Sequence, residues 1–271
     1  MRKFGLIGFP LSHSFSKKYF SDKFKKEQIE DCSYELYPLD NISKFPSLIS
    51  RNPELMGLNV TIPYKIAIIP FLDELDESAK EVGAVNCIKI VRDNPPGYKS
   101  KTRNDNIKLV GFNTDAYGFQ RALMPYLKPY HKGALVIGTG GAAKAVGYCL
   151  KKLEIDSTYI SRNPKSEFYF KFSDFTEQDY KDTLLIVNAS PIGMVPNQKT
   201  FPPIVYKALT PKHLLFDLVY NPKETVFLMK GKAAGAIVCG GLQMLQYQAD
   251  KSWDIWNETV SAAETGLVTT P

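Results

Sequence analysis

The stretch that decides the fold lies at residues 133–143 and reads Gly-Ala-Leu-Val-Ile-Gly-Thr-Gly-Gly-Ala-Ala. It opens with an apolar run typical of a buried strand, and residues 142–153 have the apolar spacing of a helix. A glycine-rich turn between a strand and a helix is typical of a dinucleotide-binding loop, because glycines let backbone N–H groups approach a pyrophosphate. The charge of the pyrophosphate then lies at the positive end of the helix. A turn of this kind can also be purely structural.

Strand and helix patterns alternate on both sides of this stretch. Apolar runs predict strands at residues 4–8, 33–39, 57–61 and 84–91 before it, and at 157–161, 184–188, 214–219 and 236–239 after it. Segments with helical spacing separate most of these strands, and such alternation predicts mostly parallel sheets. Residues 92–108 are rich in charges and carry Pro and Gly, so we expect an exposed hairpin or loop there.

We therefore predict an α/β fold with two domains. The first comprises residues 1–112, has a mostly parallel sheet, and is completed by residues 241–271, whose helix returns to it. The second comprises residues 113–240 and is a Rossmann-type domain. Ligands of such sheets bind at the carboxyl ends of the strands, so we expect the functional residues to lie there.

Composition and charge exclude several classes of protein. The chain has 271 residues, of which 44% are hydrophobic and 23% charged, which is typical of a soluble enzyme. No apolar run approaches the roughly 20 residues that cross a bilayer, and the first residues lack a signal-peptide pattern, so we expect no membrane partner and a cytoplasmic location. The net charge of +6 comes from dispersed Lys and Arg residues, which does not favour nucleic acid as a partner. Four separated cysteines and three histidines predict neither a metal site nor disulfides.

The strand after the glycine-rich turn ends in Ser161-Arg162-Asn163. An NAD-binding unit usually carries an acidic residue here for the ribose hydroxyls, and this chain has none. Arg162, together with Lys165, can instead hold a 2′-phosphate through charge-assisted hydrogen bonds. The position favours NADP over NAD, although an arginine in a turn is more often only solvated.

Two further stretches place polar groups where a strand meets a helix. Residues 58–65 run from a strand into a helix with Pro63 at the first helical position, so Lys65 falls in the first turn. The positive end of the helix disfavours the charged form of Lys65 and suits it to proton transfer. Ser14 and Ser16 follow the first strand and can face one ligand, such as a carboxylate. Taken alone, Lys65 is a surface charge, and Ser16 and Asp115 are helix caps.

Seven motifs, taken in order along the chain, resemble those of the shikimate dehydrogenase family. They are Ser14-Phe15-Ser16, Asn59-Val60-Thr61-Ile62-Pro63-Tyr64-Lys65, Gly83-Ala84-Val85-Asn86, Asn113-Thr114-Asp115, Gly138-Thr139-Gly140-Gly141-Ala142, Asp217-Leu218-Val219-Tyr220, and residues 241–248, Gly-Leu-Gln-Met-Leu-Gln-Tyr-Gln. The resemblance spans nearly the whole chain, and residues 59–65 form its most specific motif. It implies a reversible hydride transfer between NADP(H) and the 3-position of shikimate, giving 3-dehydroshikimate, on the route to chorismate and the aromatic amino acids.

The resemblance also implies roles for single residues. Lys65 and Asp115 match the catalytic pair: Lys65 would exchange a proton with the substrate oxygen, and Asp115 would orient Lys65 and bind a substrate hydroxyl. The residues that match substrate-binding positions are Ser14, Ser16, Thr61, Asn86, Asp115, Tyr220 and Gln248. The residues that match cofactor-binding positions are Gly138, Thr139, Gly140, Gly141, Ala142, Ser161, Arg162, Asn163, Ser190, Leu218 and Gly241. The first domain would then bind the substrate and the second would bind NADP.

Two departures and several alternatives accompany this resemblance. Ser161-Arg162-Asn163 stands where the family has Asn-Arg-Thr, and Gln243 stands where Gly is common on the nicotinamide side. The chain could instead be a quinate/shikimate dehydrogenase relative that uses NAD or accepts quinate. A non-catalytic sensor that binds NADP and a small acid is a further alternative. The expected oligomeric state is a monomer or a homodimer.

Overall fold

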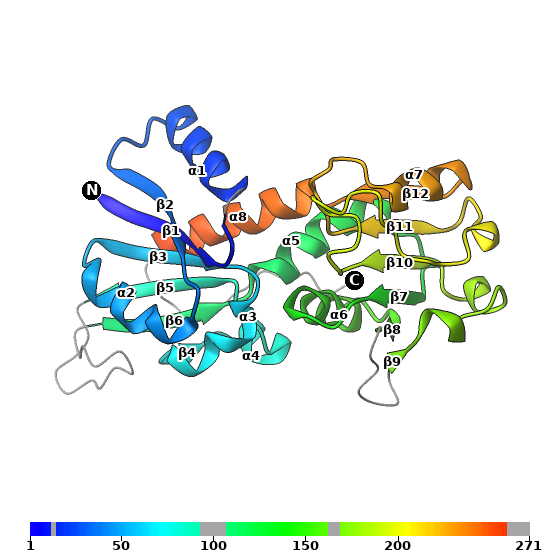
Figure 1. Cartoon of the computed structure of the whole chain (residues 1–271), viewed down its shortest axis with the longest axis horizontal. Helices are drawn as coiled ribbons and strands as arrows, with labels where there is room; N and C mark the ends of the chain where they lie inside the picture. The colour runs from blue at the N-terminus through cyan, green and yellow to red at the C-terminus, as the bar shows by residue number, and fades with distance from the viewer. Residues whose placement is uncertain (12–14, 93–106, 162–168, 259–271) are drawn as a thin grey trace. The chain divides into compact units, whose positions relative to one another are not determined.

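The computed structural model describes residues 1–11, 15–92, 107–161 and 169–258, and it divides into two compact units (Figure 1). The first unit comprises Met1–Thr114 and the chain from Ala249 to the last described residue, Glu258, and the second comprises Asp115–Gln248. Each unit is built on one six-stranded sheet, which confirms the predicted α/β fold. The functional domain boundaries after residues 112 and 240 remain a prediction.

The sheet of the first unit has the strand order β2-β1-β3-β5-β6-β4. Its strands are β1 (Arg2–Gly8), β2 (Cys32–Pro38), β3 (Leu55–Val60), β4 (Glu74–Leu75), β5 (Cys87–Arg92) and β6 (Ile107–Phe112). Its helices are α1 (Phe15–Lys26), α2 (Phe45–Arg51), α3 (Tyr64–Ala67) and α4 (Glu77–Val82). β2 and β3 flank β1 in parallel and β4 is parallel to β6, whereas β5 is antiparallel to β3 and β6. The sheet is therefore mixed, with mostly parallel pairings.

An aromatic cluster packs the last part of the described chain into the first unit. The ring of Phe4 in β1 stacks on Trp256 with centroids 4.8 Å apart and meets Trp253 edge-on at 5.3 Å. Phe20 of α1 stacks on Tyr34 of β2 at 4.4 Å. Both tryptophans belong to α8 (Leu242–Asn257), the long helix that ends the described chain. Burial of these large rings makes the last part of α8 part of the first unit's core.

Two local details of the first unit differ from the sequence-based expectation. No strand was predicted at 107–112, yet β6 lies there and pairs antiparallel with β5 from Arg92 opposite Ile107 to Cys87 opposite Phe112. The charged residues before β6 hid its short apolar run, and the predicted loop falls largely on residues 93–106, outside the described residues. Pro63 is the N-cap of α3 and follows a cis peptide bond, so the prediction that it is the first helical residue was wrong.

The sheet of the second unit has the order β12-β11-β10-β7-β8-β9, and every pairing in it is parallel. Its strands are β7 (Gly133–Ile137), β8 (Asp156–Ile160), β9 (Tyr169–Phe170), β10 (Leu185–Asn188), β11 (Leu214–Asp217) and β12 (Ile237–Gly240). The helices are α5 (Thr114–Leu123), α6 (Gly141–Lys152), α7 (Val226–Ala233) and the first part of α8. This is the doubly wound order of a Rossmann fold, whose ligand crevice lies where the order reverses, between β7 and β10.

Alternating side chains of the central strand cover both faces of this second sheet. Ala134 and Val136 of β7 belong to the core cluster that includes residues of α5 and α6. Leu135 and Ile137 belong to the cluster on the other face, which includes residues of α7. A parallel strand that is buried on both faces needs a continuous apolar run, which explains the apolar sequence of residues 133–137.

Short 3₁₀ turns link several of these elements. They lie at Ile42–Lys44, Ile69–Phe71, Met124–Tyr126, Phe172–Asp174, Asp179–Lys181 and Tyr206–Ala208. Among the helices of the described residues, none has the length and apolar character needed to cross a membrane.

Candidate active site

The motif at residues 59–65 forms the turn that follows β3. The N–H of Thr61 donates to the carbonyl of Ile7 at 2.9 Å, which holds the turn against the end of β1. The buried Tyr64 donates its hydroxyl to the carbonyl of Leu39 at 2.5 Å. These bonds fix the backbone on either side of the half-buried Lys65. Thr61 and Lys65 therefore lie at the carboxyl end of β3.

The environment of Lys65 corrects one part of the sequence argument. α3 spans only Tyr64–Ala67, a single turn. The dipole of a helix is the sum of its aligned peptide units, so one turn contributes little. The helix end therefore gives little support for proton transfer by Lys65, and the argument for this lysine rests on its position.

Asn86 joins the start of β5 to the start of α5. Its backbone N–H donates to Phe112 at 3.1 Å, and its side-chain Oδ1 accepts from the N–H of Thr114 at 2.7 Å. Its Nδ2 donates to the hydroxyl of Thr114 at 2.9 Å. The preceding residue, Val85, donates its N–H to the carbonyl of Lys65 at 2.7 Å. Lys65, Asn86 and Thr114 are thus linked through neighbouring hydrogen bonds in the first unit.

Asp115 directly follows Thr114 and is 5% exposed. Because α5 begins at Thr114, Asp115 lies within the first turn of the helix and is not its N-cap. A carboxylate in the first turn is stabilised by the positive end of the helix. The simple alternative of a capping role for Asp115 is therefore wrong, and its assignment to the catalytic pair stays a prediction.

The serine pair is only partly described. Ser14 lies outside the described residues. Ser16 is the second residue of α1, so it is not the helix cap considered from the sequence. A hydrogen bond with Ser16 lowers the pKa of Tyr34, against a larger rise caused by burial. Ser16 therefore contacts the interior of the unit, and its role in binding a carboxylate stays a prediction.

Five buried residues of the first unit form a continuous set of hydrogen bonds that we call the buried polar chain. Its members are at most 4% exposed and are Tyr34, Asn59, Ser252, Thr114 and Asn86. The Tyr34 hydroxyl donates to Asn59 Oδ1 at 2.9 Å, and Asn59 Nδ2 donates to Ser252 Oγ at 2.9 Å. Ser252 Oγ lies 3.2 Å from the hydroxyl of Thr114, which bonds to Asn86. The sequence analysis assigned no role to Asn59 or Ser252.

The glycine-rich turn of the second unit leads from β7 into α6. Gly138 has φ +120°, and a Cβ there would lie 2.9 Å from the carbonyl oxygen of Ala189, so the position requires glycine. Gly140 is the N-cap of α6, and no side chain caps this helix. A Cβ on Gly140 would meet nothing within 4 Å. The open space at the uncapped start of α6 can accommodate a pyrophosphate. No acidic residue lies in the first turn of α6 to repel its negative charge.

A buried carboxylate holds the loops that follow β10 and β11. Asp217 accepts hydrogen bonds from Asn188 Nδ2 at 2.9 Å, from the N–H of Val219 at 3.0 Å and from the Thr225 hydroxyl at 2.5 Å. Burial raises the pKa of Asp217 to about 6, and these hydrogen bonds partly oppose the rise. Ser190 donates its hydroxyl to Asn188 Oδ1 at 2.6 Å. Asp217 thus fixes the strand ends beside the glycine-rich turn, a role that the sequence analysis did not assign.

The remaining cofactor candidates follow strand ends of the second unit. Ser161 comes directly after β8 and donates its N–H to the carbonyl of Phe170 at 2.9 Å. Leu218 follows β11, and a Cβ on Gly241 would lie 2.3 Å from its carbonyl oxygen, so the chains approach closely there. Thr139 is exposed, and Gly141 and Ala142 open α6. Arg162 and Asn163 lie outside the described residues.

Two substrate candidates lie in the second unit. Tyr220 is half-buried in the loop after β11, and burial raises its pKa. Gln248 of α8 is buried, and its Nε2 donates to the carbonyl of Leu245 at 3.0 Å. A Cβ on Gly118 of α5 would lie 3.0 Å from the Cβ of Gln248, so the two helices pack closely. Gln243, one of the departures from the family, is exposed at the second position of α8.

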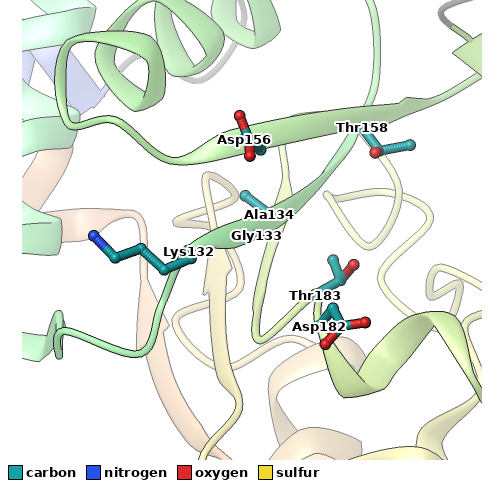
Figure 2. Close-up of a pocket in the computed structure, with 7 residues that line it drawn as sticks. All are labelled: Lys132, Gly133, Ala134, Asp156, Thr158, Asp182 and Thr183. Carbon is teal, nitrogen blue, oxygen red and sulfur yellow. The ribbon is translucent and has the colours of Figure 1, made fainter.

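The pocket in Figure 2 is separate from these residues. It has a volume of about 290 Å³ and is lined by Lys132, Gly133, Ala134, Asp156, Thr158, Asp182 and Thr183. Most of these residues precede or begin β7, β8 and β10, and Thr158 lies in the middle of β8, so the pocket lies towards the amino ends of the parallel strands. The glycine-rich turn lies at the opposite, carboxyl ends. Among the described residues, no group of three or more His, Cys, Asp and Glu side chains could hold a metal ion.

Comparison with known proteins gives a consistent result. Residues 6–88 match the model of the shikimate dehydrogenase substrate binding domain. The chain is 34% identical to a shikimate dehydrogenase (NADP(+)) of Desulforamulus reducens, over 93% of this chain and 88% of the relative. The crystal structure of the Thermus thermophilus enzyme with NADP(H) and shikimate is 28% identical, with a TM-score of 0.77 and coverage of 95% and 94%. The Listeria monocytogenes enzyme, crystallised with shikimate and NAD, is 25% identical, with a TM-score of 0.76 and coverage of 94% and 91%.

Proposed function

The chain belongs to the shikimate dehydrogenase family, and we propose that it catalyses the reversible, NADPH-dependent reduction of 3-dehydroshikimate to shikimate. One observation carries this proposal. Thr61, Lys65 and Asn86, which match substrate and proton-transfer positions, lie at neighbouring strand ends of one unit, and Val85, the residue before Asn86, donates its N–H to the carbonyl of Lys65. The reaction serves the route to chorismate and the aromatic amino acids.

Lys65 and Asp115 are the acid–base pair of the proposed mechanism. Bound NADPH supplies the hydride that reduces the 3-keto carbon. The ammonium of Lys65 donates a proton to the oxygen that becomes negative, which yields the alcohol, and it takes the proton back in the oxidation direction. The carboxylate of Asp115 orients Lys65 and accepts a hydrogen bond from a ring hydroxyl of the substrate.

Polar side chains that match the family's substrate-binding positions hold the substrate. Ser14 and Ser16 bind its carboxylate through their hydroxyls, and Thr61 and Asn86 bind ring hydroxyls. Tyr220 and Gln248 also bind the substrate through their polar groups. The hydroxyls and amides of these residues match a substrate that carries one carboxylate and several hydroxyl groups.

The cofactor is held by the turn from Gly138 to Ala142. The backbone N–H groups at the start of α6 bind its pyrophosphate, for which the open space at Gly140 leaves room. Ser161, Arg162 and Asn163 follow β8, and Arg162 binds the 2′-phosphate that distinguishes NADP from NAD. Ser190, Leu218 and Gly241 come from the ends of β10, β11 and β12 and line the same edge of the sheet.

The proposal is tested by absorbance of the reduced nicotinamide, with shikimate or quinate offered together with NADP⁺ or NAD⁺. We expect reduction with shikimate and NADP⁺. Efficient turnover of quinate, or equal use of NAD⁺, would assign the chain to the broader quinate/shikimate relatives. No turnover with any pair, in the presence of measurable NADPH binding, would favour a sensor.

The role of Arg162 in cofactor choice has its own test. Arg162→Ala should weaken the binding of NADPH by about tenfold or more while it leaves NADH nearly unchanged, because only NADPH carries the 2′-phosphate. Fluorescence titration with both cofactors measures the two dissociation constants. An equal loss with both would mean that Arg162 does not contact this phosphate.

Location and assembly complete the proposal. The four cysteines, at positions 32, 87, 149 and 239, are all free, which suits a reducing compartment, and we place the enzyme in the cytoplasm. Its partners are small molecules, with no nucleic acid and no membrane among them. We propose a monomer or a homodimer, which light scattering after size-exclusion chromatography will distinguish.

A further inference from the structure

Asn59 lies within the buried polar chain, and both its side-chain oxygen and its side-chain nitrogen bond to other residues of the unit. Its Oδ1 accepts from Tyr34, and its Nδ2 donates to Ser252 Oγ at 2.9 Å and to the carbonyl of Asn86 at 3.2 Å. An amide nitrogen has two N–H groups, so both are used within the unit. Asn59 therefore acts as a junction between strands β2, β3 and β5.

Ser252 is the link that brings α8 into this junction. It is 0% exposed, and its hydroxyl lies between Asn59 Nδ2 and the hydroxyl of Thr114. Asn59 lies one residue before the end of β3, Thr114 begins α5, and Ser252 of α8 lies 138 residues after Thr114 in the sequence. A buried hydroxyl in such a place fixes its partners, since an unpaired buried donor is costly.

The partners of Ser252 are directly connected to residues of the proposed reaction. Thr114 precedes Asp115, and its backbone N–H and hydroxyl are both bonded to the amide of Asn86. A shift of Thr114 would therefore move the start of α5, and Asp115 with it. The same shift would release the side chain of Asn86.

We propose that Ser252 is a positioning residue that sets the orientation of Asp115 and Asn86 through Thr114. This inference rests on the proposed function of those two residues. It makes α8 part of the substrate-binding machinery through a side chain that touches no substrate. Loss of the hydroxyl should impair substrate binding and turnover while cofactor binding is retained, because the whole buried polar chain belongs to the first unit.

The test compares Ser252→Ala with two other variants in steady-state kinetics with shikimate and NADP⁺. Tyr34→Phe removes the hydrogen bonds of the Tyr34 hydroxyl with Asn59 and with Ser16 and keeps the ring in its aromatic cluster, so its effect counts for the buried polar chain only where it is non-additive with that of Ser252→Ala. Tyr180→Phe is the matched control: this residue of the second unit is 1% exposed and its hydroxyl accepts from the N–H of Val205 at 3.2 Å. All assays run well below the melting temperature of each variant.

We expect Ser252→Ala to lower kcat/KM for shikimate by about tenfold or more, since small misplacements of catalytic groups cost this much. KM for NADP⁺ should stay within about twofold of the wild-type value. Tyr34→Phe should act in the same direction with a smaller loss, and the double variant should lose less than the product of the single losses because both act through Asn59. Tyr180→Phe should lower only the melting temperature.

The inference is overturned if Ser252→Ala and Tyr34→Phe behave like Tyr180→Phe, with kcat and both KM values unchanged. If Ser252→Ala does not fold, unchanged kinetics of Tyr34→Phe overturn it alone. Failure of the proposed function is a separate result, because it appears as absence of turnover with shikimate in the wild-type protein, before any variant is compared.

Discussion

The two units hold their strand ends with different kinds of buried group. In the first unit, the buried polar chain consists of amides and hydroxyls and carries no charge. In the second unit, the corresponding centre is the carboxylate of Asp217, which accepts three hydrogen bonds. The candidate sites differ in the same way: side chains dominate the first, whereas glycines that expose the backbone dominate the second. The two units should therefore respond to different changes. The first should be sensitive to loss of a hydrogen-bonding side chain, and the stability of the second should depend on pH.

The largest expected effect separates chemistry from cofactor binding. Lys65→Ala should lower kcat by about 10² to 10⁴, which is the usual contribution of general acid–base catalysis. The dissociation constant of NADPH should not change, because Lys65 belongs to the first unit. Initial rates and fluorescence titration measure the two quantities. Lys80→Ala, an exposed lysine of α4, is the control, and a near-normal kcat for Lys65→Ala would exclude Lys65 from the mechanism.

The second effect concerns pH and distinguishes the charged centre from the neutral one. Burial raises the pKa of Asp217 to about 6, from an ordinary value of 3.8. The folded protein binds this proton more tightly than the unfolded chain, so the contribution of Asp217 to the free energy of unfolding is fully present below about pH 4 and is lost as the pH rises through about 6. The change amounts to about 3 kcal/mol.

Urea unfolding between pH 4 and pH 7.5 measures this contribution. The stability difference between wild type and Asp217→Asn should vary with pH between about 4 and 6. The difference between wild type and Tyr34→Phe should stay constant over the same range, because the buried polar chain has no group that titrates there. A constant difference for Asp217→Asn would contradict the assigned pKa and would remove the contrast between the units.

The third effect compares two glycines of the same turn. Gly138→Ala should lower the free energy of unfolding by about 1–3 kcal/mol, because φ is +120° there and the new Cβ would lie 2.9 Å from a carbonyl oxygen. Gly140→Ala should leave stability nearly unchanged, since its Cβ meets nothing within 4 Å. If the cofactor occupies that space, NADPH binding should weaken by about tenfold or more. Unchanged NADPH binding in Gly140→Ala would place the pyrophosphate elsewhere.

The smallest effect is expected at the surface of the first unit. Lys23 of α1 bonds to Glu27 at 2.9 Å and to Asp250 of α8 at 3.0 Å. Lys23 is itself half-buried, but the side chains of Glu27 and Asp250 are exposed, so water and salt screen these ion pairs and Lys23→Met should lower the free energy of unfolding by at most about 1 kcal/mol. Lys18→Met, whose partner Asp22 lies in the same helix, is the control. If the loss is larger and persists in 1 M salt, the stabilisation by Lys23 does not come from a solvent-screened ion pair.

The sequence predicted much of the fold because its strongest patterns are local. Residues 133–143 combine an apolar strand, glycines and a helix within a short window, and β7, the turn and α6 follow that pattern. Strand β6 was missed because its apolar run adjoins a charged stretch. The prediction that Pro63 is the first helical residue was also wrong, because the residue at which a helix starts is shifted by one position more easily than the local sequence can show.

The candidate site was predictable only where residues lie in motifs. Lys65, Asn86 and Asp115 stand in such motifs, whereas Ser252 is a single serine in an amphipathic helix with no local signal. Its role arises from contacts with Asn59 and Thr114, which are distant in sequence. The raised pKa of Asp217 depends on burial and on its three donors, which only the folded chain brings together.

The aromatic cluster at the end of α8 gives the protein a natural optical reporter. The chain contains only two tryptophans, and both Trp253 and Trp256 pack against Phe4 in the first unit. Their emission therefore follows the unfolding of that unit alone, whereas far-ultraviolet circular dichroism follows the helices and strands of both. Coincident denaturation curves from the two signals would mean that the units melt as one, and separated curves would give the stability of each without any added label.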